Sequence, residues 1–145
     1  MTPEAGANIR RLRVDHDGAD RFRIAIRDHT LVVDQTVADG GGDSGPTPTE
    51  LLVAGLASCV AFYVRRFLAR HELPVKGLSV TADFGMAAQP ARVGEIRLLV
   101  HLPADLPPMR RAALLAVAAH CTVHNTLLQP PAVSIELAAP VPASA

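Results

Sequence analysis

The first third of the chain alternates apolar with polar residues, the period of two that is typical of β-strands with one buried face. The alternation covers NIRRLRV (residues 8–14) and RFRIAIRD (21–28), and the intervening DHDGAD supplies the Asp and Gly of a hairpin turn. HTLVVDQTV (29–37) continues the pattern as a third short strand. We therefore predict an antiparallel meander over residues 8–37.

A glycine-rich loop, ADGGGDSGP (residues 38–46), separates this meander from a strongly apolar helix. Thr47 is a favourable N-cap, Pro48 suits the first helical position, and Glu50, three residues after Thr47, completes a capping box. The segment LLVAGLASCVAFYV (51–64) that follows is apolar on every face of a helix. We therefore predict a long helix that begins at Thr47 and is buried on all sides.

The second half of the chain predicts a hairpin, two further helices and a last strand. LSVTADFGM (78–86) and EIRLLVHL (95–102) have strand-like patterns and form the hairpin, and MRRAALLAVAAH (109–120) forms the second helix. HCTVHNTLL (120–128) restarts as a short helix that the following prolines end, and AVSIEL (132–137) closes the chain as a strand.

Strands and helices are segregated along the sequence, so the predicted class is α+β. The length of 145 residues fits a single domain over 1–145, with frayed ends at 1–7 and 139–145. The two longer helices carry much apolar surface for a chain with so few aromatic residues. Leaving one face of the first helix in water would be costly at roughly 25 cal/mol per Å², so we expect a homodimer that packs these helices together.

The charges exclude several classes of partner. Basic and acidic residues balance at 14 each and form no blocks, so neither nucleic acid nor a membrane surface is an expected partner, and small neutral molecules fit better. The opening MTPEAGANIRRLRVD has no apolar core of a signal peptide, and no run reaches 18 apolar residues without a charge. We therefore predict a cytoplasmic protein without a membrane span.

The two cysteines, Cys59 and Cys121, are the main candidates for chemistry. They could form a structural disulfide, act as paired redox thiols, or be two inert core residues, and Cys59 in an apolar helix suits the last role by residue type alone. Cys121 stands at a break between helices, where backbone N–H groups and a charged His120 or His124 would lower the pKa of its thiol and keep it reactive.

Metal binding is the rival use of the same motif. His120, Cys121 and His124 lie within five residues, and only Cys59 offers a fourth ligand for zinc. We predict no metal here.

Other candidate groups are given structural roles. The glycine-rich loop precedes a helix N-terminus, which attracts anions, but it lacks the Lys-Ser/Thr ending of a phosphate-binding loop, and Pro48 removes one donor. We interpret the loop as a flexible connection. The remaining histidines are scattered singly and are expected at the surface or hydrogen-bonded, namely His16, His29, His71 and His101.

GPTPTELLVAGLASC (45–59), followed by HCTVHNTL (120–127), resembles the OsmC/Ohr family of osmotically inducible and organic hydroperoxide resistance proteins. The GPTPxELL opening resembles a divergent, OsmC-like branch of that family, and the order of elements fits along the whole chain. The resemblance implies an intertwined α+β homodimer, in which two long central helices are wrapped by sheets that contain strands from both chains.

The resemblance also implies an activity, that of a thiol peroxidase. Cys59 would be the peroxidatic thiol that attacks the O–O bond of an organic hydroperoxide, and Cys121 the resolving thiol that forms a disulfide with it. An external dithiol would supply reducing equivalents, and no metal, flavin or haem cofactor is required. The alternative is a non-catalytic binding or redox-sensing module that holds a small apolar ligand at the dimer interface, near Leu56, Phe62 and Tyr63.

The chain departs from the family pattern at two positions. Thr49 stands where the family peroxidases carry a glutamate, and Thr122 replaces a proline after the second cysteine. Glu50 lies nine residues before Cys59, which on a straight helix is about half a turn away from its face, so capping explains Glu50 better than catalysis. The arginine that would activate Cys59 is to be sought among Arg10, Arg11, Arg13, Arg21, Arg23 and Arg27.

Overall fold

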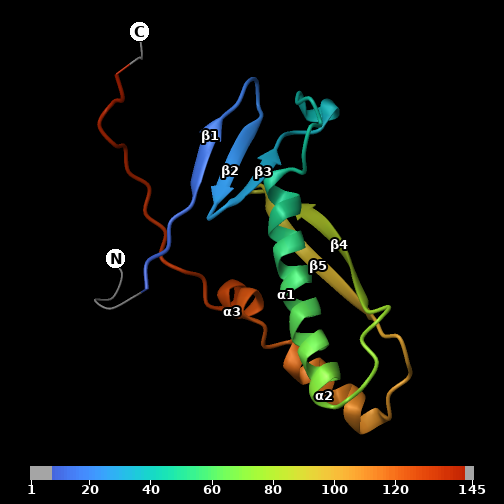
Figure 1. Ribbon diagram of the computed structural model, residues 1–145. Coiled ribbons are helices and arrows are strands. Elements are labelled where there is room, and N and C mark those ends of the chain that lie inside the picture. The colour runs from blue at the N-terminus through green and yellow to red at the C-terminus, as the bar shows by residue number, and fades with distance from the viewer. Residues whose placement is uncertain (1–7, 143–145) are drawn as a thin grey trace.

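The computed structural model describes residues 8–142 and begins with the expected antiparallel meander (Figure 1). Its strands are β1 (Arg13–His16), β2 (Phe22–Ile26) and β3 (His29–Val33), in the order β1-β2-β3. The first hairpin turns at Asp17–Arg21, where the N–H of Asp17 donates to the carbonyl of Arg21 at 2.9 Å. The meander is confirmed, although residues 8–12 precede β1 and are not part of a strand.

The long helix α1 (Pro48–Arg70) begins where the capping box places it. The N–H of Glu50 donates to Oγ1 of Thr47 at 3.1 Å, and the N–H of Thr47 donates to Oε1 of Glu50 at 2.9 Å. Two backbone N–H groups that would otherwise lack a partner at the start of the helix are thereby satisfied. The Glu50 carboxylate is part of the cap.

The glycine-rich loop before α1 is packed rather than being the flexible connection that we expected. A side chain at Gly45 would place its Cβ 2.3 Å from the carbonyl oxygen of Val32, a distance that only glycine avoids. Asp34, only 3% exposed, follows β3 and accepts hydrogen bonds from Oγ of Ser44 at 2.6 Å and from the N–H of Gln35 at 2.8 Å. This buried carboxylate fastens the loop to the end of β3 and so positions the start of α1.

The second half contains the predicted hairpin and both predicted helices. Strands β4 (Ser79–Ala87) and β5 (Arg92–His101) form a separate two-stranded antiparallel sheet, with a register shift at Gly85/Met86. Helix α2 (Pro108–Ala118) follows, and α3 (Thr122–Leu128) is the short last helix. Both β4–β5 and α2 lie against α1, as Figure 1 shows.

The core lies along one face of α1, which makes the predicted burial of the whole helix wrong for a single chain. Its buried residues recur at helical spacing, with Leu56, Val60 and Val64 among them, whereas Leu52 is 46% and Phe62 48% exposed. One chain supplies only β4–β5, α2 and α3 as cover. The length and composition of α1 would also suit a membrane-spanning helix, and in this chain one of its faces packs against β4–β5, α2 and α3.

The predicted last strand, AVSIEL, is not formed within the chain. The described residues after α3 contain neither helix nor strand, and Val133, Ile135 and Leu137 are 78%, 92% and 100% exposed. A strand needs a neighbour for its N–H and C=O groups, and Figure 1 shows this segment running away from β4–β5. Of the ends expected to fray, residues 139–142 are exposed and irregular, while 1–7 and 143–145 lie outside the described residues.

We predict that Asp34 makes the stability of the protein pH-dependent under acid conditions. The hydrogen bonds from Ser44 and Gln35 lower the pKa of this carboxyl from 3.8 to about 2. Its contribution is therefore fully present above pH 3.8 and is lost as the pH falls toward 2. Urea unfolding measured across this range should show a smaller loss for Ser44→Ala than for the wild type.

Ser58→Ala is the matched control, because the Ser58 hydroxyl donates to the carbonyl of Gly55 and touches no carboxylate. An identical acid dependence in the wild type and Ser44→Ala would contradict the role of Asp34.

Candidate active site

Cys121 is placed by the break between α2 and α3. It is the N-cap of α3 with an extended backbone, and its Sγ accepts a hydrogen bond from the N–H of His124 at 3.3 Å. Its side chain is completely buried in the cluster formed by α1 and α2. The turn after His120 therefore carries the thiol into the core rather than to the surface.

Cys59 lies in the middle of α1, is half-buried, and packs against the same cluster. Its thiol is close enough to Cys121 to affect the ionisation of that residue, and both cysteines are free. The structure thus brings together the two residues that the sequence separates by 62 positions.

The two thiols differ in their surroundings. Burial raises the pKa of Cys121, and the N–H of His124 and the Cys59 thiol only modify that effect, the first lowering and the second raising the pKa. Our expectation that helix N–H groups and charged histidines keep Cys121 reactive is therefore wrong, because desolvation of the thiolate outweighs the hydrogen bonds from the N–H groups of Val123 and His124. Cys59 is the more accessible of the two sulfurs.

A hydrogen bond next to the cysteines was not foreseen from the sequence. The hydroxyls of Tyr63 and Thr122 lie 3.0 Å apart and join α1 to the first residue of α3. Tyr63 is four residues after Cys59, hence on the same face of α1, and Thr122 directly follows Cys121. The spacing of four residues could have placed Tyr63 beside Cys59 from the sequence alone. It could not have shown that Thr122 is the hydrogen-bond partner of Tyr63.

A pocket with largely aliphatic walls, which Glu95 also lines, lies one helical turn from each cysteine, and neither cysteine lines it. It has a volume of about 340 Å³ and lies between α1, β5 and α3. Leu56, one turn before Cys59, and His124, one turn after Cys121, both contribute to its wall. The other side chains that give it its apolar character are Leu52, Ile96, Leu127 and Leu128. Of the residues expected near a ligand, Leu56 lines this pocket, whereas Phe62 and Tyr63 do not.

Other candidate groups lie apart from the cysteines. Thr49 and Glu50 line a depression at the start of α1. Arg13, Arg21 and Arg23 pair with aspartates of the meander, and within residues 8–142 no arginine forms a hydrogen bond with either cysteine. In the same range no three His, Cys, Asp or Glu side chains gather as a metal site would require, so the four candidate zinc ligands do not form one.

The family model for OsmC-like protein matches residues 40–136, which contain both cysteine motifs. The chain belongs to the OsmC-like family. The match begins in the glycine-rich loop and ends in the irregular C-terminal segment, so it includes every element that surrounds Cys59 and Cys121. No curated protein matches the chain in sequence.

Solved structures share the fold of this OsmC-like protein. One, from Psychrobacter arcticus and assigned to the osmotic stress and detoxification response, has a TM-score of 0.76 at 22% identity, with 83% of this chain and 89% of that chain covered. The organic hydroperoxide resistance protein OsmC from Legionella pneumophila has a TM-score of 0.64 at 21% identity, with 83% and 90% covered.

A third structure, from Vibrio cholerae and assigned to organic hydroperoxide resistance, has captopril bound in one of its active sites. Its TM-score is 0.63 at 17% identity, with 86% of this chain and 88% of that chain covered. At these identities the three structures establish the fold of the chain.

We predict that the folded, reduced protein is alkylated at Cys59 before Cys121. Cys121 is fully buried with a raised thiol pKa, so iodoacetamide at pH 8 should modify it at least about tenfold more slowly. Peptide mapping by mass spectrometry over time measures both rates.

Cys59→Ser and Cys121→Ser are the controls, since each reports the rate of the remaining thiol alone. Faster modification of Cys121 in the wild type would contradict the burial of its side chain.

Proposed function

We propose that this protein is a thiol-dependent peroxidase that reduces organic hydroperoxides, with Cys59 as the peroxidatic and Cys121 as the resolving thiol. The observation that carries the proposal is the meeting of an accessible and a buried cysteine in one chain, beside an apolar pocket of about 340 Å³. Membership of the OsmC-like family and relatives named for hydroperoxide resistance support a redox-related role.

The reaction proceeds in three balanced steps. The Cys59 thiolate attacks the outer oxygen of the hydroperoxide, the O–O bond breaks, and the alcohol leaves with a proton, so that Cys59 becomes a sulfenic acid. The Cys121 thiol then attacks the sulfur of Cys59, its proton passes to the departing hydroxide, which leaves as water, and a disulfide forms. An external dithiol reduces this disulfide by exchange and is itself oxidised to a disulfide.

The surroundings of each thiol suit its step. Cys59 is only partly buried, so a peroxide would reach it with its apolar part in the neighbouring pocket beside Leu56. The protonated, buried Cys121 is protected from the oxidant until Cys59 has reacted. A cycle through free thiols requires a reducing compartment, so we assign the protein to the cytoplasm.

We further propose that the working form is an intertwined homodimer. A second copy would cover the exposed face of α1 around Leu52. It would also offer a sheet edge to the segment 132–137, whose apolar residues already alternate as a strand requires. The resemblance to the OsmC/Ohr family supports this arrangement.

A binding or redox-sensing module is the second candidate, and the apolar pocket between α1, β5 and α3 favours it. In that case the pocket would hold a small apolar ligand without turnover. Native mass spectrometry of protein from cells separates the two functions, because a co-purified ligand without peroxide consumption supports this one.

We predict that the reduced protein consumes cumene hydroperoxide with turnover by dithiothreitol. One equivalent of hydroperoxide should remove two hydrogens from the intact mass, through the disulfide between Cys59 and Cys121. Cys59→Ser should lower peroxide consumption to the background rate. Cys121→Ser should still react once and accumulate a sulfenic acid that dimedone traps.

Retention of peroxidase activity by Cys59→Ser would contradict the peroxidase assignment. If instead Cys121→Ser yields no trappable sulfenic acid and both variants are folded, the order of the two thiols is wrong.

We predict a mass near twice the 15.3 kDa of one chain in sedimentation experiments at micromolar concentration. Ile135→Asp should weaken the dimer, because it puts a charge at an apolar position of the alternating segment 132–137. Ser134→Asp adds the same charge at the neighbouring polar position and should leave the dimer intact. A stable monomer at this concentration would contradict the proposal.

A further inference from the structure

A second, smaller pocket lies on α1 beyond the cysteine pair. It has a volume of about 170 Å³ and is lined by two arginines together with apolar and aromatic side chains. Four of its lining residues come from α1 and one from α2, namely Tyr63, Arg66, Phe67, Arg70 and Val117. We propose that this pocket, defined by Arg66 and Arg70, binds a small organic carboxylate.

Arg66 and Arg70 are four residues apart and therefore project from the same side of α1. Within residues 8–142 the ion pairs lie in the meander, and neither of these arginines pairs with a carboxylate. The sequence contains no acidic residue between Glu50 and Glu72, and α2 contains none. Two unneutralised guanidinium groups at one pocket attract an anion.

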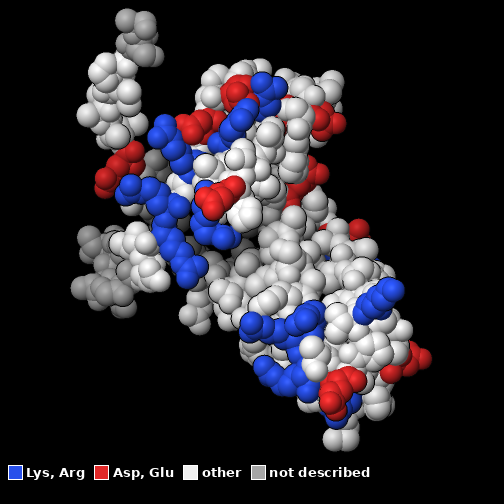
Figure 2. Space-filling model, in the orientation of Figure 1, with Lys and Arg blue, Asp and Glu red and all other residues white. Residues whose placement is uncertain are grey.

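The positive charge continues along this end of the molecule. Figure 2 shows Lys and Arg side chains over the lower half of α1 and over α2, with a few Asp and Glu side chains at the lower tip. Arg110 at the start of α2 donates to Nδ1 of His71, and the ring of His71 lies 4.4 Å from that of Phe67 in the pocket wall.

Arg66 is held in place by an aromatic ring. The guanidinium of Arg66 lies over the ring of Phe62, 4.5 Å from its centroid, a stacked arrangement that restricts the side chain. A guanidinium group already held in position suits a carboxylate, which can accept two parallel hydrogen bonds from it.

The size and the wall of the pocket define the rest of the ligand. Its volume is below the roughly 300–1,000 Å³ of pockets for drug-sized molecules, so the occupant is small. Phe67 and Val117 offer apolar contacts to a short hydrocarbon body. A monocarboxylate with a short alkyl chain meets both requirements, and inorganic phosphate meets only the charge requirement.

The pocket has a structural link to the cysteines through Tyr63. This side chain lines the pocket, and its hydroxyl is bonded to Thr122 beside Cys121. An occupant would therefore contact the residue that joins α1 to α3. The binding site itself does not depend on the proposed peroxidase chemistry and can be tested without it.

The sequence supplies a built-in probe. Tyr63 is the only tyrosine and the chain has no tryptophan, so intrinsic fluorescence reports on this pocket alone. Titration of the full-length protein with hexanoate should give a saturable change, and 1-hexanol should bind at least about tenfold more weakly because it lacks the charge. Arg66→Gln and Arg70→Gln should each weaken hexanoate binding about tenfold.

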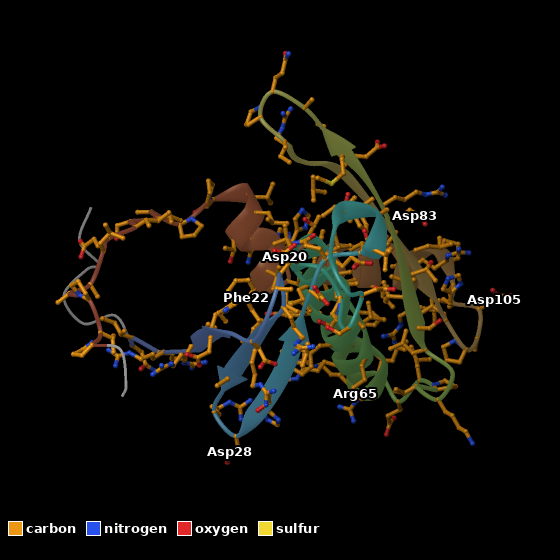
Figure 3. The ribbon with its side chains drawn as sticks, turned by 90° about the horizontal axis from the view of Figure 1, so that it is seen from above. Asp20, Phe22, Asp28, Arg65, Asp83 and Asp105 are labelled. Carbon is orange, nitrogen blue, oxygen red and sulfur yellow. The ribbon has the colours of Figure 1, made fainter. Side chains whose placement is uncertain are left out.

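Arg65→Gln is the matched control, because it removes the same charge from the neighbouring position. Arg65 does not line the pocket, and Figure 3 shows it pointing outward from α1. Its affinity for hexanoate should stay within about twofold of the wild type, as expected for a screened surface charge. Circular dichroism checks that each variant is folded, and the salt dependence of hexanoate binding to the wild type gives a measurement that needs no variant.

Four results would overturn the proposal. They are no saturable change with hexanoate, equal affinity for 1-hexanol, equal weakening by Arg65→Gln, and equal affinity for inorganic phosphate. Failure of hexanoate binding together with full peroxidase activity would remove this site and leave the proposed function standing.

Discussion

Burial of one face of α1 is the constraint on which the other parts of the structure depend. Leu56, Val60 and Val64 form a stripe that only a sheet and a helix on the same side can cover, and β4–β5 and α2 supply that cover. Because α2 must lie along this stripe, the turn that follows it has to bring Cys121 into the same layer. The position of the second thiol is thus a result of packing around the first helix.

The same packing gives two chemically identical residues different properties. Cys121 has no access to water, so the charged form of its thiol is disfavoured, while Cys59 on α1 is only half-buried. A reagent from solvent therefore meets Cys59 first. The bond between Tyr63 and Thr122 holds the two helices together at this point, so α3 cannot move away from α1 without breaking it.

Several apolar surfaces of the single chain are exposed. They are the start of α1 at Leu52, Leu31 of the meander and the alternating segment around Ile135. Such surfaces are far more apolar than a solvated face requires, and they fit the cover that a second copy would provide. At the other end of α1 the arginines replace apolar residues, so one helix carries the thiol site along its middle and a basic pocket near its C-terminus.

Local signals in the sequence determined most of the secondary structure. The capping box at Thr47 and Glu50 fixed the start of α1, because both bonds form within four residues, and strand-like patterns identified the three strands of the meander and the two of the second hairpin. The sequence also singled out both cysteines. Tertiary structure decided the environment of the two thiols. Burial raises the pKa of Cys121 more than the backbone N–H donors lower it. It also decided that AVSIEL forms no strand in one chain and that α1 keeps an exposed face, because pairing and burial require neighbours that no local pattern supplies.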